Sequence, residues 1–395
     1  MTGSTFSRFR LSRLRLRNYR SIRSCNLELG QVTMLVGPNG SGKSNVLDSL
    51  RLVRQALGET LDNALRDRGG VKEVRRRSTG RPTSFTVTID FLESAGGAEG
   101  TYELQVGAVS GGGFRVAKES CTITSTEPGG GRHYYEIRGG EVVSTSEDRL
   151  PRLSADRLAL VSLSGIEVFR PVYDGLSAME VFSPSPEAMR RPVAPDPGDL
   201  LRRDGSNIAS VIERLDRARP EVKRRIEDYL HSIVPGVESV RRLAVARWET
   251  LEFQQRVQGA SAPWSFQATS VSDGTLRALG VLVALFAGTG TTLSAVGVEE
   301  PETALHPAAA GVLLDAIRDA SERRQVLLTT HSPDLLDSAS IRPDELLAVR
   351  SVEGTTEVSR PDEASRMALK ESLFTAGELL RADQLHPEVR EVVAS

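Results

Sequence analysis

The stretch from residue 37 to residue 45 reads Gly37-Pro38-Asn39-Gly40-Ser41-Gly42-Lys43-Ser44-Asn45. An apolar run precedes it at residues 32–36, and apolar residues follow it at helical spacing, namely Val46, Leu47, Leu50, Val53 and Leu57. A strand, a glycine-rich turn and a helix in this order are typical of a phosphate-binding loop. Glycine lets backbone N–H groups point inward at phosphate oxygens, and the positive end of the helix adds to the attraction. The stretch therefore predicts nucleotide binding.

Two side chains of this loop have expected roles. Lys43 is expected to reach the β- and γ-phosphates of ATP, and Ser44 to offer its hydroxyl to Mg²⁺. The alternative is a glycine turn that binds nothing. The strand before the loop and the helix after it argue against that alternative, because the motif requires this context.

The whole chain has 395 residues, 39% of them hydrophobic, and a net charge of −2. This length allows one large domain or two ordinary ones. No run approaches the roughly 20 apolar residues of a membrane helix, and the arginine-rich N-terminus lacks the apolar core of a signal peptide. We therefore expect a cytoplasmic protein with no membrane partner. The two cysteines, Cys25 and Cys121, are too few and too far apart for a disulfide framework or a metal site.

Basic residues gather locally although the total charge is balanced. The first thirty positions contain Arg8, Arg10, Arg13, Arg15, Arg17, Arg20 and Arg23 against Glu28. Further clusters lie at 75–77 with Arg81, at 190–191, and at 223–225 with 241–242. Such clusters suit the phosphates of nucleic acid, which makes DNA a candidate partner. Arginines that alternate along a strand are equally well explained as its solvated face, so both explanations stay open.

The middle of the chain changes to period-two alternation. Residues 84–91 form a clear strand pattern, and further strands are expected at 101–106, 113–116 and 133–137, with glycine-rich turns between them at 96–97, 111–113 and 129–131. A proline-rich stretch at 183–197 ends this antiparallel lobe. Helices are expected after Ser206 and after Pro220.

Strands and helices alternate in the last part of the chain. Strands are expected at 239–248, 250–255, 293–298 and 326–329, and helices at 275–286 and from Pro307. This order favours an α/β fold with a mixed sheet covered by helices. We divide the chain into an ATPase core at 1–68 and 265–360, an insertion at 69–264 with a β-lobe and a helical lobe, and a helical tail at 361–395.

Three further features follow predicted strands or begin a predicted helix. Glu299 and Glu300 end a buried strand, where one carboxylate can hold Mg²⁺ through water and the next can polarise an attacking water. His331 follows another buried strand and can contact the γ-phosphate. Ser272 and Gly274 begin a helix, a second anion-binding geometry. Each alone has an ordinary structural explanation, but together they complete a nucleotide site.

These segments together resemble the ATPase heads of the ABC, SMC and RecF group, and the resemblance covers almost the whole chain. It implies a P-loop NTPase fold of ABC/SMC-head type and a homodimer that forms on ATP. Ser272 and Gly274 match the signature motif, which contacts the γ-phosphate of ATP in the opposite subunit. Glu300 matches the catalytic glutamate and His331 the switch histidine. The segment 303–306 matches the loop that crosses the dimer interface.

The chain is more closely similar to RecF-like, OLD-type ATPases of bacteria. The similarity rests on the segments 299–307, 272–277 and 204–207. Some relatives act in DNA repair and some in phage defence. This chain departs from the wider pattern in two ways. Glu299 stands where the usual residue is aspartate, and no glutamine lies between Gln105 and Gln254 to serve as the Q-loop.

Three functions compete for this Mg²⁺-dependent ATPase. The first is a DNA-acting repair or anti-phage ATPase, and the second is a regulatory subunit that controls a separately encoded effector, such as a nuclease, without binding DNA. The third, a transporter subunit, is disfavoured by the long insertion before Ser272 and by the absent Q-loop. A long SMC arm is excluded by the lack of heptads. No acidic metal motif follows His331, so a nuclease is expected as a separate protein.

Overall fold

The computed structural model describes residues 9–78, 82–94, 97–109, 113–127, 130–151, 157–288 and 293–388. The sequence features at Arg8, Arg81, Gly96, Gly111 and Gly129 lie outside these ranges, as does the end of the expected tail at 389–395. No helix in the described ranges is long and apolar enough to cross a membrane.

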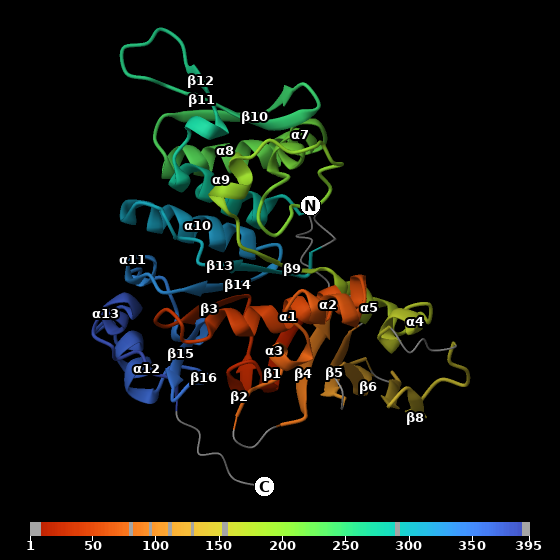
Figure 1. Cartoon of the computed structure of the whole chain (residues 1–395). Helices are drawn as coiled ribbons and strands as arrows, with labels where there is room; N and C mark the ends of the chain where they lie inside the picture. The colour runs from red at the N-terminus through yellow and green to blue at the C-terminus, as the bar shows by residue number, and fades with distance from the viewer. Residues whose placement is uncertain are drawn as a thin grey trace.

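Within the described residues, thirteen strands form one mixed sheet, in the order β8-β7-β6-β5-β4-β1-β2-β16-β15-β3-β14-β13-β9 (Figure 1). The strands are β1 Phe9–Tyr19, β2 Ile22–Glu28, β3 Val32–Val36, β4 Ser84–Glu93, β5 Ala98–Ala108, β6 Phe114–Ser125, β7 Arg132–Arg138, β8 Glu141–Thr145, β9 Met179–Phe182, β13 Ala295–Glu299, β14 Gln325–Thr330, β15 Leu346–Val352 and β16 Thr355–Ser359. A second sheet contains β10 Val237–Val245, β11 Trp248–Gln255 and β12 Trp264–Gln267.

The helices cover both faces of the large sheet. They are α1 Lys43–Gly58, α2 Leu61–Arg66, α3 Val71–Val74, α4 Ala159–Leu163, α5 Arg170–Ser177, α6 Pro186–Arg190, α7 Ile208–Ala218, α8 Pro220–Ile233, α9 Asp273–Phe286, α10 Ala310–Ser321, α11 Pro333–Leu336, α12 Glu363–Lys370 and α13 Ala376–Arg381. Figure 1 shows α7, α8 and α9 with the small sheet on one side of β13 and β14, and α1 with α2 and α5 on the other. Two apolar cores result, one on each side.

The parallel part of the sheet places the predicted motifs at one edge. β15, β3, β14, β13 and β9 run in the same direction, and β3 and β14 are buried along their whole length. The register pairs Val36 with Thr330 and Glu299 with Thr329. The residues that follow these three strands therefore meet at their carboxyl ends, where ligands bind in such sheets.

The antiparallel part of the large sheet explains why arginines alternate with apolar residues near the N-terminus. β1 alternates, so that Leu14 and Leu16 are buried in the core while Arg13 and Arg15 point toward solvent. Arg13 pairs with Glu28 and Arg15 with Asp90. These two arginines thus fit the solvated-face explanation.

The strands that we expected in an inserted β-lobe belong to the same sheet as β1, because β4 pairs with β1 in antiparallel register.

The division of the chain into core, insertion and tail stays a prediction. One predicted strand ends earlier than expected: β10 stops at Val245, because Ala246 has a positive φ of 51° and the chain turns back into β11. The sequence pattern does not predict the strands β2, β8, β9, β12, β15 and β16. Of these, β9 and β15 pair with strands far away in the chain, whereas the other four pair with the strand that precedes them.

Candidate functional site

The phosphate loop connects β3 to α1 at the carboxyl edge of the sheet. Gly42 caps the helix in a left-handed conformation with φ 99°, and no side chain occupies the first free N–H groups of α1. Pro38, Asn39 and Gly40 are exposed, and so is Ser44. Free amides at a helix N-terminus attract anions. The loop is therefore open to a phosphate group.

Two loop glycines are required by contacts with the C-terminal part of the chain. A Cβ on Gly37 would lie 2.0 Å from the carbonyl oxygen of Val349 in β15. A Cβ on Gly42 would lie 2.0 Å from Oγ1 of Thr356 in β16. The Thr356 hydroxyl also donates to the carbonyl oxygen of Ser41 at 2.8 Å. β15 and β16 thus hold the loop from behind.

Asn45 adds a second support for the loop. Its Nδ2 donates to Oγ of Ser21 at 2.7 Å, and Ser21 Oγ lies 2.7 Å from Thr356 Oγ1. This chain of hydrogen bonds joins the first turn of α1 to the β1–β2 turn and to β16. Asn45 therefore has a structural role here besides the nucleotide role predicted for it.

Lys43 is buried beneath the loop, with 4% of its surface exposed. Its Nζ donates to the carbonyl oxygens of Gly37 at 2.8 Å and Pro38 at 3.0 Å. Burial lowers the pKa of Lys43, and the carboxylates of Glu300 and Glu302 partly oppose this effect. A desolvated ammonium that has only neutral hydrogen-bond partners interacts strongly with an anion such as phosphate.

Glu300 and His331 lie together where the two buried strands end. Glu300 Oε1 is 3.3 Å from His331 Nδ1, and about a third of each side chain is exposed. In the described residues the Nδ1 atom has no hydrogen-bond partner of good geometry, and the Glu300 carboxylate lies beside it. Glu300 has a positive φ of 43° and its N–H donates to Thr329. A left-handed backbone at a non-glycine residue often marks a functional site.

Glu302 is a third carboxylate of this site, and the sequence pattern did not single it out. Its Oε1 accepts hydrogen bonds from Thr330 Oγ1 at 2.6 Å and from the His331 N–H at 3.3 Å. Burial raises its pKa. Its Oε2 has no hydrogen-bond partner in the described residues. Glu302 therefore fixes the start of the loop that carries His331.

Two arginines also belong to the site and were missed by the sequence analysis. Arg277 of α9 donates to the carbonyl oxygens of Glu299 at 2.7 Å and Glu300 at 2.9 Å, and burial lowers its pKa. Arg203 pairs with the Glu299 carboxylate, with Nη2 to Oε2 at 3.2 Å. Arg203 directly precedes the segment 204–207, on which part of the family resemblance rests. This position was the signal in the sequence that could have drawn attention to Arg203.

Arg203 lies beside the residues that follow β9. β9 runs parallel to β13 at the edge of the sheet, and the residues after it bind the Arg203 segment through the backbone. The N–H of Ser183 donates to the Arg203 carbonyl at 2.9 Å, and that of Ser185 donates to the Asp204 carbonyl at 2.8 Å. An arginine from the loop before α7 therefore contacts the Glu299 carboxylate directly.

Ser272 and Gly274 lie at the start of α9. Ser272 is exposed and caps the helix by accepting from the Thr275 N–H at 3.2 Å. A Cβ on Gly274 would lie 2.5 Å from the carbonyl oxygen of Ala304, in the loop after β13. In the described part of the chain, neither residue makes a hydrogen bond to the phosphate loop. The structure therefore gathers Lys43, Glu299, Glu300 and His331 at the carboxyl ends of three neighbouring strands, whereas Ser272 is exposed and Gly274 lies against Ala304.

The donor set fits Mg²⁺ bound together with a nucleotide. Mg²⁺ is usually held by one or two carboxylates, with phosphate oxygens and waters as its other ligands. The exposed hydroxyl of Ser44 and the carboxylate of Glu299 supply such oxygens at the mouth of the loop. The described residues contain no cluster of three or more histidine, cysteine or acidic side chains that would bind a metal alone.

Comparisons with known proteins agree with this geometry. Residues 32–337 match the model of a family described as "AAA domain, putative AbiEii toxin, Type IV TA system". The chromosome partition protein Smc of Gloeobacter violaceus is 28% identical over 201 residues, 49% of this chain and 16% of the relative. Structural maintenance of chromosomes protein 1B of Mus musculus is 42% identical over 66 residues, 16% of this chain and 5% of the relative. This chain thus aligns with a small part of both relatives.

Solved SMC heads share the fold at low sequence identity. An Smc head bound to the C-winged helix domain of ScpA has a TM-score of 0.55 and 15% identity, covering 88% of this chain and 97% of that chain. An Smc head with an extended coiled coil, bound to the C-terminal domain of ScpA from Pyrococcus furiosus, has a TM-score of 0.50 and 14% identity, with coverages of 92% and 99%. The predicted P-loop fold of ABC/SMC-head type is confirmed.

Proposed function

This chain belongs to the AbiEii-type AAA family, and we propose from this premise that it hydrolyses MgATP to ADP and phosphate and that ATP joins two copies of it. One observation carries the proposal. Lys43, Glu300 and His331 meet at the carboxyl ends of adjacent parallel strands, beside free amides of α1. This arrangement supplies groups for phosphate binding, water activation and γ-phosphate contact in one place.

Each residue has a defined part in the proposed reaction. The loop amides and Lys43 bind the β- and γ-phosphates, while Ser44 and Glu299 would hold Mg²⁺. The bound ion would neutralise charge on the phosphate oxygens. Glu300 orients or deprotonates the attacking water, and His331 contacts the γ-phosphate. Glu302 and Arg277 hold the backbone on which Glu300 and His331 are presented.

The exposed signature residues support a site shared between two copies. Ser272, at the exposed start of α9, and Gly274 make no hydrogen bond to their own phosphate loop in the described residues. A second copy related by a two-fold axis can bring this helix end to the γ-phosphate. ATP then stabilises the dimer, and hydrolysis releases it.

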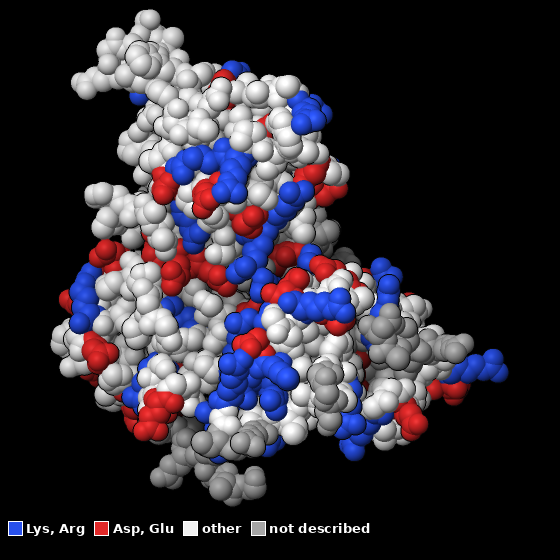
Figure 2. All heavy atoms as spheres, viewed as in Figure 1, with Lys and Arg blue, Asp and Glu red and all other residues white. Residues whose placement is uncertain are grey.

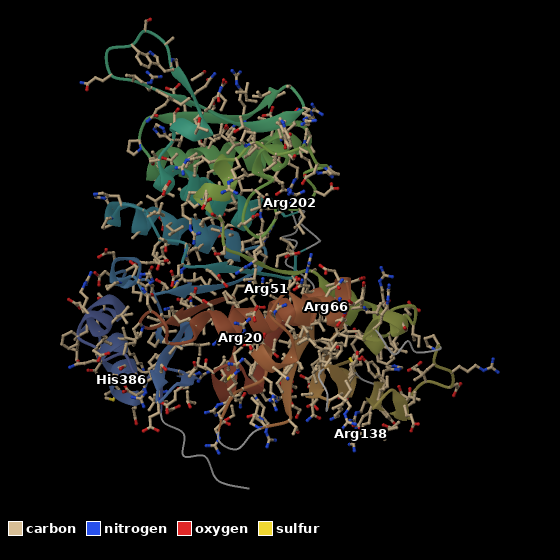
Figure 3. The ribbon with its side chains drawn as sticks, in the orientation of Figure 1. Arg20, Arg51, Arg66, Arg138, Arg202 and His386 are labelled. Carbon is tan, nitrogen blue, oxygen red and sulfur yellow. The ribbon has the colours of Figure 1, made fainter. Side chains whose placement is uncertain are left out.

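We propose DNA as the target of the ATP-bound dimer, in repair or anti-phage defence, as in RecF-like and OLD-type ATPases. Figure 2 shows a band of Lys and Arg side chains on one face, and Figure 3 places Arg202, Arg51, Arg66 and Arg20 on this face. Arg66 pairs with Asp62 across exposed atoms and Arg202 with Asp196. Exposed ion pairs contribute only about 0–1 kcal/mol, so DNA phosphates can compete for these arginines.

The variant Glu300→Gln tests the ATPase and the DNA target. It should bind ATP with parental affinity but lose at least about 100-fold in hydrolysis rate, because general-base catalysis contributes roughly 10²–10⁴-fold. Duplex DNA is then titrated onto the ATP-bound variant at several salt concentrations. We expect an affinity that falls steeply with salt, because phosphate contacts release counterions.

Two results would contradict the proposal. Parental hydrolysis by Glu300→Gln removes this residue as the base. Failure of DNA to bind at low salt excludes the DNA target and favours the second candidate, a regulatory ATPase that controls a separately encoded effector such as a nuclease. Two exposed tryptophans at separate places on the small sheet support that candidate: 41% of Trp248 and 55% of Trp264 are exposed. Such side chains are frequent at protein interfaces.

A further inference from the structure

Four arginines surround a small pocket at the far end of α9, away from the nucleotide site. They are Arg219 between α7 and α8, Arg225 in α8, and Arg323 and Arg324 just before β14. The pocket has a volume of about 40 Å³, and Phe286 of α9 forms part of its wall. β14 begins at this end and finishes at the nucleotide edge, so the two sites lie at opposite ends of the strand.

Two of these arginines cover the end of α9. Arg219 donates to the carbonyl oxygens of Ala287 and Gly288, the latter at 3.2 Å. Arg324 Nη2 donates to the Gly288 carbonyl at 3.1 Å. The C-terminus of a helix carries about half of one negative charge. This partial charge balances only a fraction of the positive charge gathered here.

Arg324 is the deeply buried member, with 5% of its surface exposed. Its Nη1 has no hydrogen-bond partner in the described residues. Burial lowers its pKa to about 10, helped by the like charges of Arg219 and Arg323. Arg324 is therefore still a cation at neutral pH. A buried charge of this kind is costly unless an opposite charge accompanies it.

The acidic groups near the pocket do not provide that charge. Asp319 pairs with Arg225 and accepts a hydrogen bond from Tyr229. Glu221 acts on Arg219 at long range without forming an ion pair. Among the described residues, Arg219, Arg323 and Arg324 form no ion pair with a carboxylate. The segment 289–292, which lies outside the described residues, has the sequence Thr-Gly-Thr-Thr and contains no acidic residue.

We propose that this pocket binds a phosphate group. Guanidinium groups present planar pairs of N–H donors that match phosphate oxygens, and Arg324 Nη1 finds no acceptor among the described residues. One water needs roughly 10–15 Å³ of such space, so about 40 Å³ suits a small tetrahedral anion and excludes a sugar or base. The phosphate is either a free inorganic ion or the terminal phosphate of a nucleic acid.

Binding there would join three segments that are far apart in the sequence. The anion would bridge the α7–α8 junction, the segment before β14 and the end of α9. α9 carries Ser272 at its other end, so a bound phosphate would stabilise the helix that the proposed dimer uses. The inference itself does not depend on the proposed function, because it rests only on the pocket and its charges.

The test uses the full chain with Lys43→Ala, which removes the main phosphate ligand of the nucleotide loop. Inorganic phosphate is titrated by calorimetry at constant ionic strength, with acetate as a control anion. We expect phosphate to bind and acetate to bind much more weakly. Adding Arg324→Gln or Arg323→Ser should raise the phosphate Kd at least about tenfold, since each removes charge-assisted hydrogen bonds.

A matched control is Arg217→Ser, because Arg217 is an exposed arginine of the same lobe that pairs with Glu213 outside the pocket. It should leave the phosphate Kd unchanged. If Arg324→Gln does not fold, the variant Arg323→Ser, at an exposed position, still tests whether the pocket binds phosphate. No phosphate binding, or equal binding by the Arg323 and Arg217 variants, overturns the proposal. Competition by a 5′-phosphorylated oligonucleotide, but not by its unphosphorylated form, assigns the nucleic-acid source; its failure assigns free phosphate.

Discussion

At the scale of single residues, the phosphate loop depends on contacts that its own sequence does not contain. Gly37 and Gly42 are expected from the motif because a nucleotide needs room. The structure adds a second reason, since Val349 and Thr356 leave no space for a Cβ even without a nucleotide. The loop is thus shaped by β15 and β16 before ATP binds.

The pair Gly42→Ala and Gly40→Ala separates these two reasons. Both glycines have a positive φ, which costs an alanine about 1–2 kcal/mol. A Cβ added at position 42 would also clash with Thr356, whereas a Cβ added at position 40 would lie in open space. We expect Gly42→Ala to lower the free energy of unfolding clearly more than Gly40→Ala, measured by urea denaturation without nucleotide. Equal losses would show that the contact with Thr356 does not matter.

At the scale of elements, the residues of the candidate site lie at the carboxyl ends of β3, β13 and β14. The loop before α7 contacts this site through Arg203. The ion pair of Arg203 with Glu299 links the loop before α7 to the carboxylate proposed for Mg²⁺. No glutamine lies between Gln105 and Gln254, and Arg203 offers a direct connection from the loop before α7 to Glu299. The positive guanidinium also opposes the binding of a cation at Glu299.

Arg203→Ala should therefore lower the Mg²⁺ concentration that half-saturates ATP binding. A partly exposed ion pair is worth up to about 1 kcal/mol, which corresponds to a change of up to about fivefold. Binding of a fluorescent ATP analogue is measured as Mg²⁺ is titrated. The control is Arg202→Ala, which removes the neighbouring pair with Asp196 and should have no such effect. The same Mg²⁺ dependence in both variants would rule out this link.

At the scale of the whole molecule, each copy would contribute its phosphate loop to one proposed nucleotide site and the start of α9 to the other. The proposed dimer completes both sites. In a Glu300→Gln background, ATP should convert the monomer to a dimer, as seen by analytical ultracentrifugation. Adding Ser272→Arg should prevent dimerisation without changing ATP affinity, because Ser272 is exposed and makes no contact with its own phosphate loop. A dimer that still forms would contradict the shared site.

Much of the site was predictable because its motifs are local. The phosphate loop, Glu299–Glu300 and His331 each follow a short buried strand, and ligands gather where such strands end. Glu302, Arg203 and Arg277 were missed because their roles depend on neighbours from other elements. The sheet order is not sequential, so no pattern along the chain shows that Thr356 lies behind residue 42.

The sequence by itself determined the phosphate loop, the positions of most long strands and helices, and the identity of the catalytic candidates. These depend on side-chain periodicity and on turn residues within a few positions of each other. Only the tertiary structure decided that β1, β2 and β4 to β8 belong to the same sheet as β3, that Arg203 meets Glu299, and that arginines gather around the end of α9. Such contacts depend on strand pairing and burial between distant segments, which local patterns do not specify.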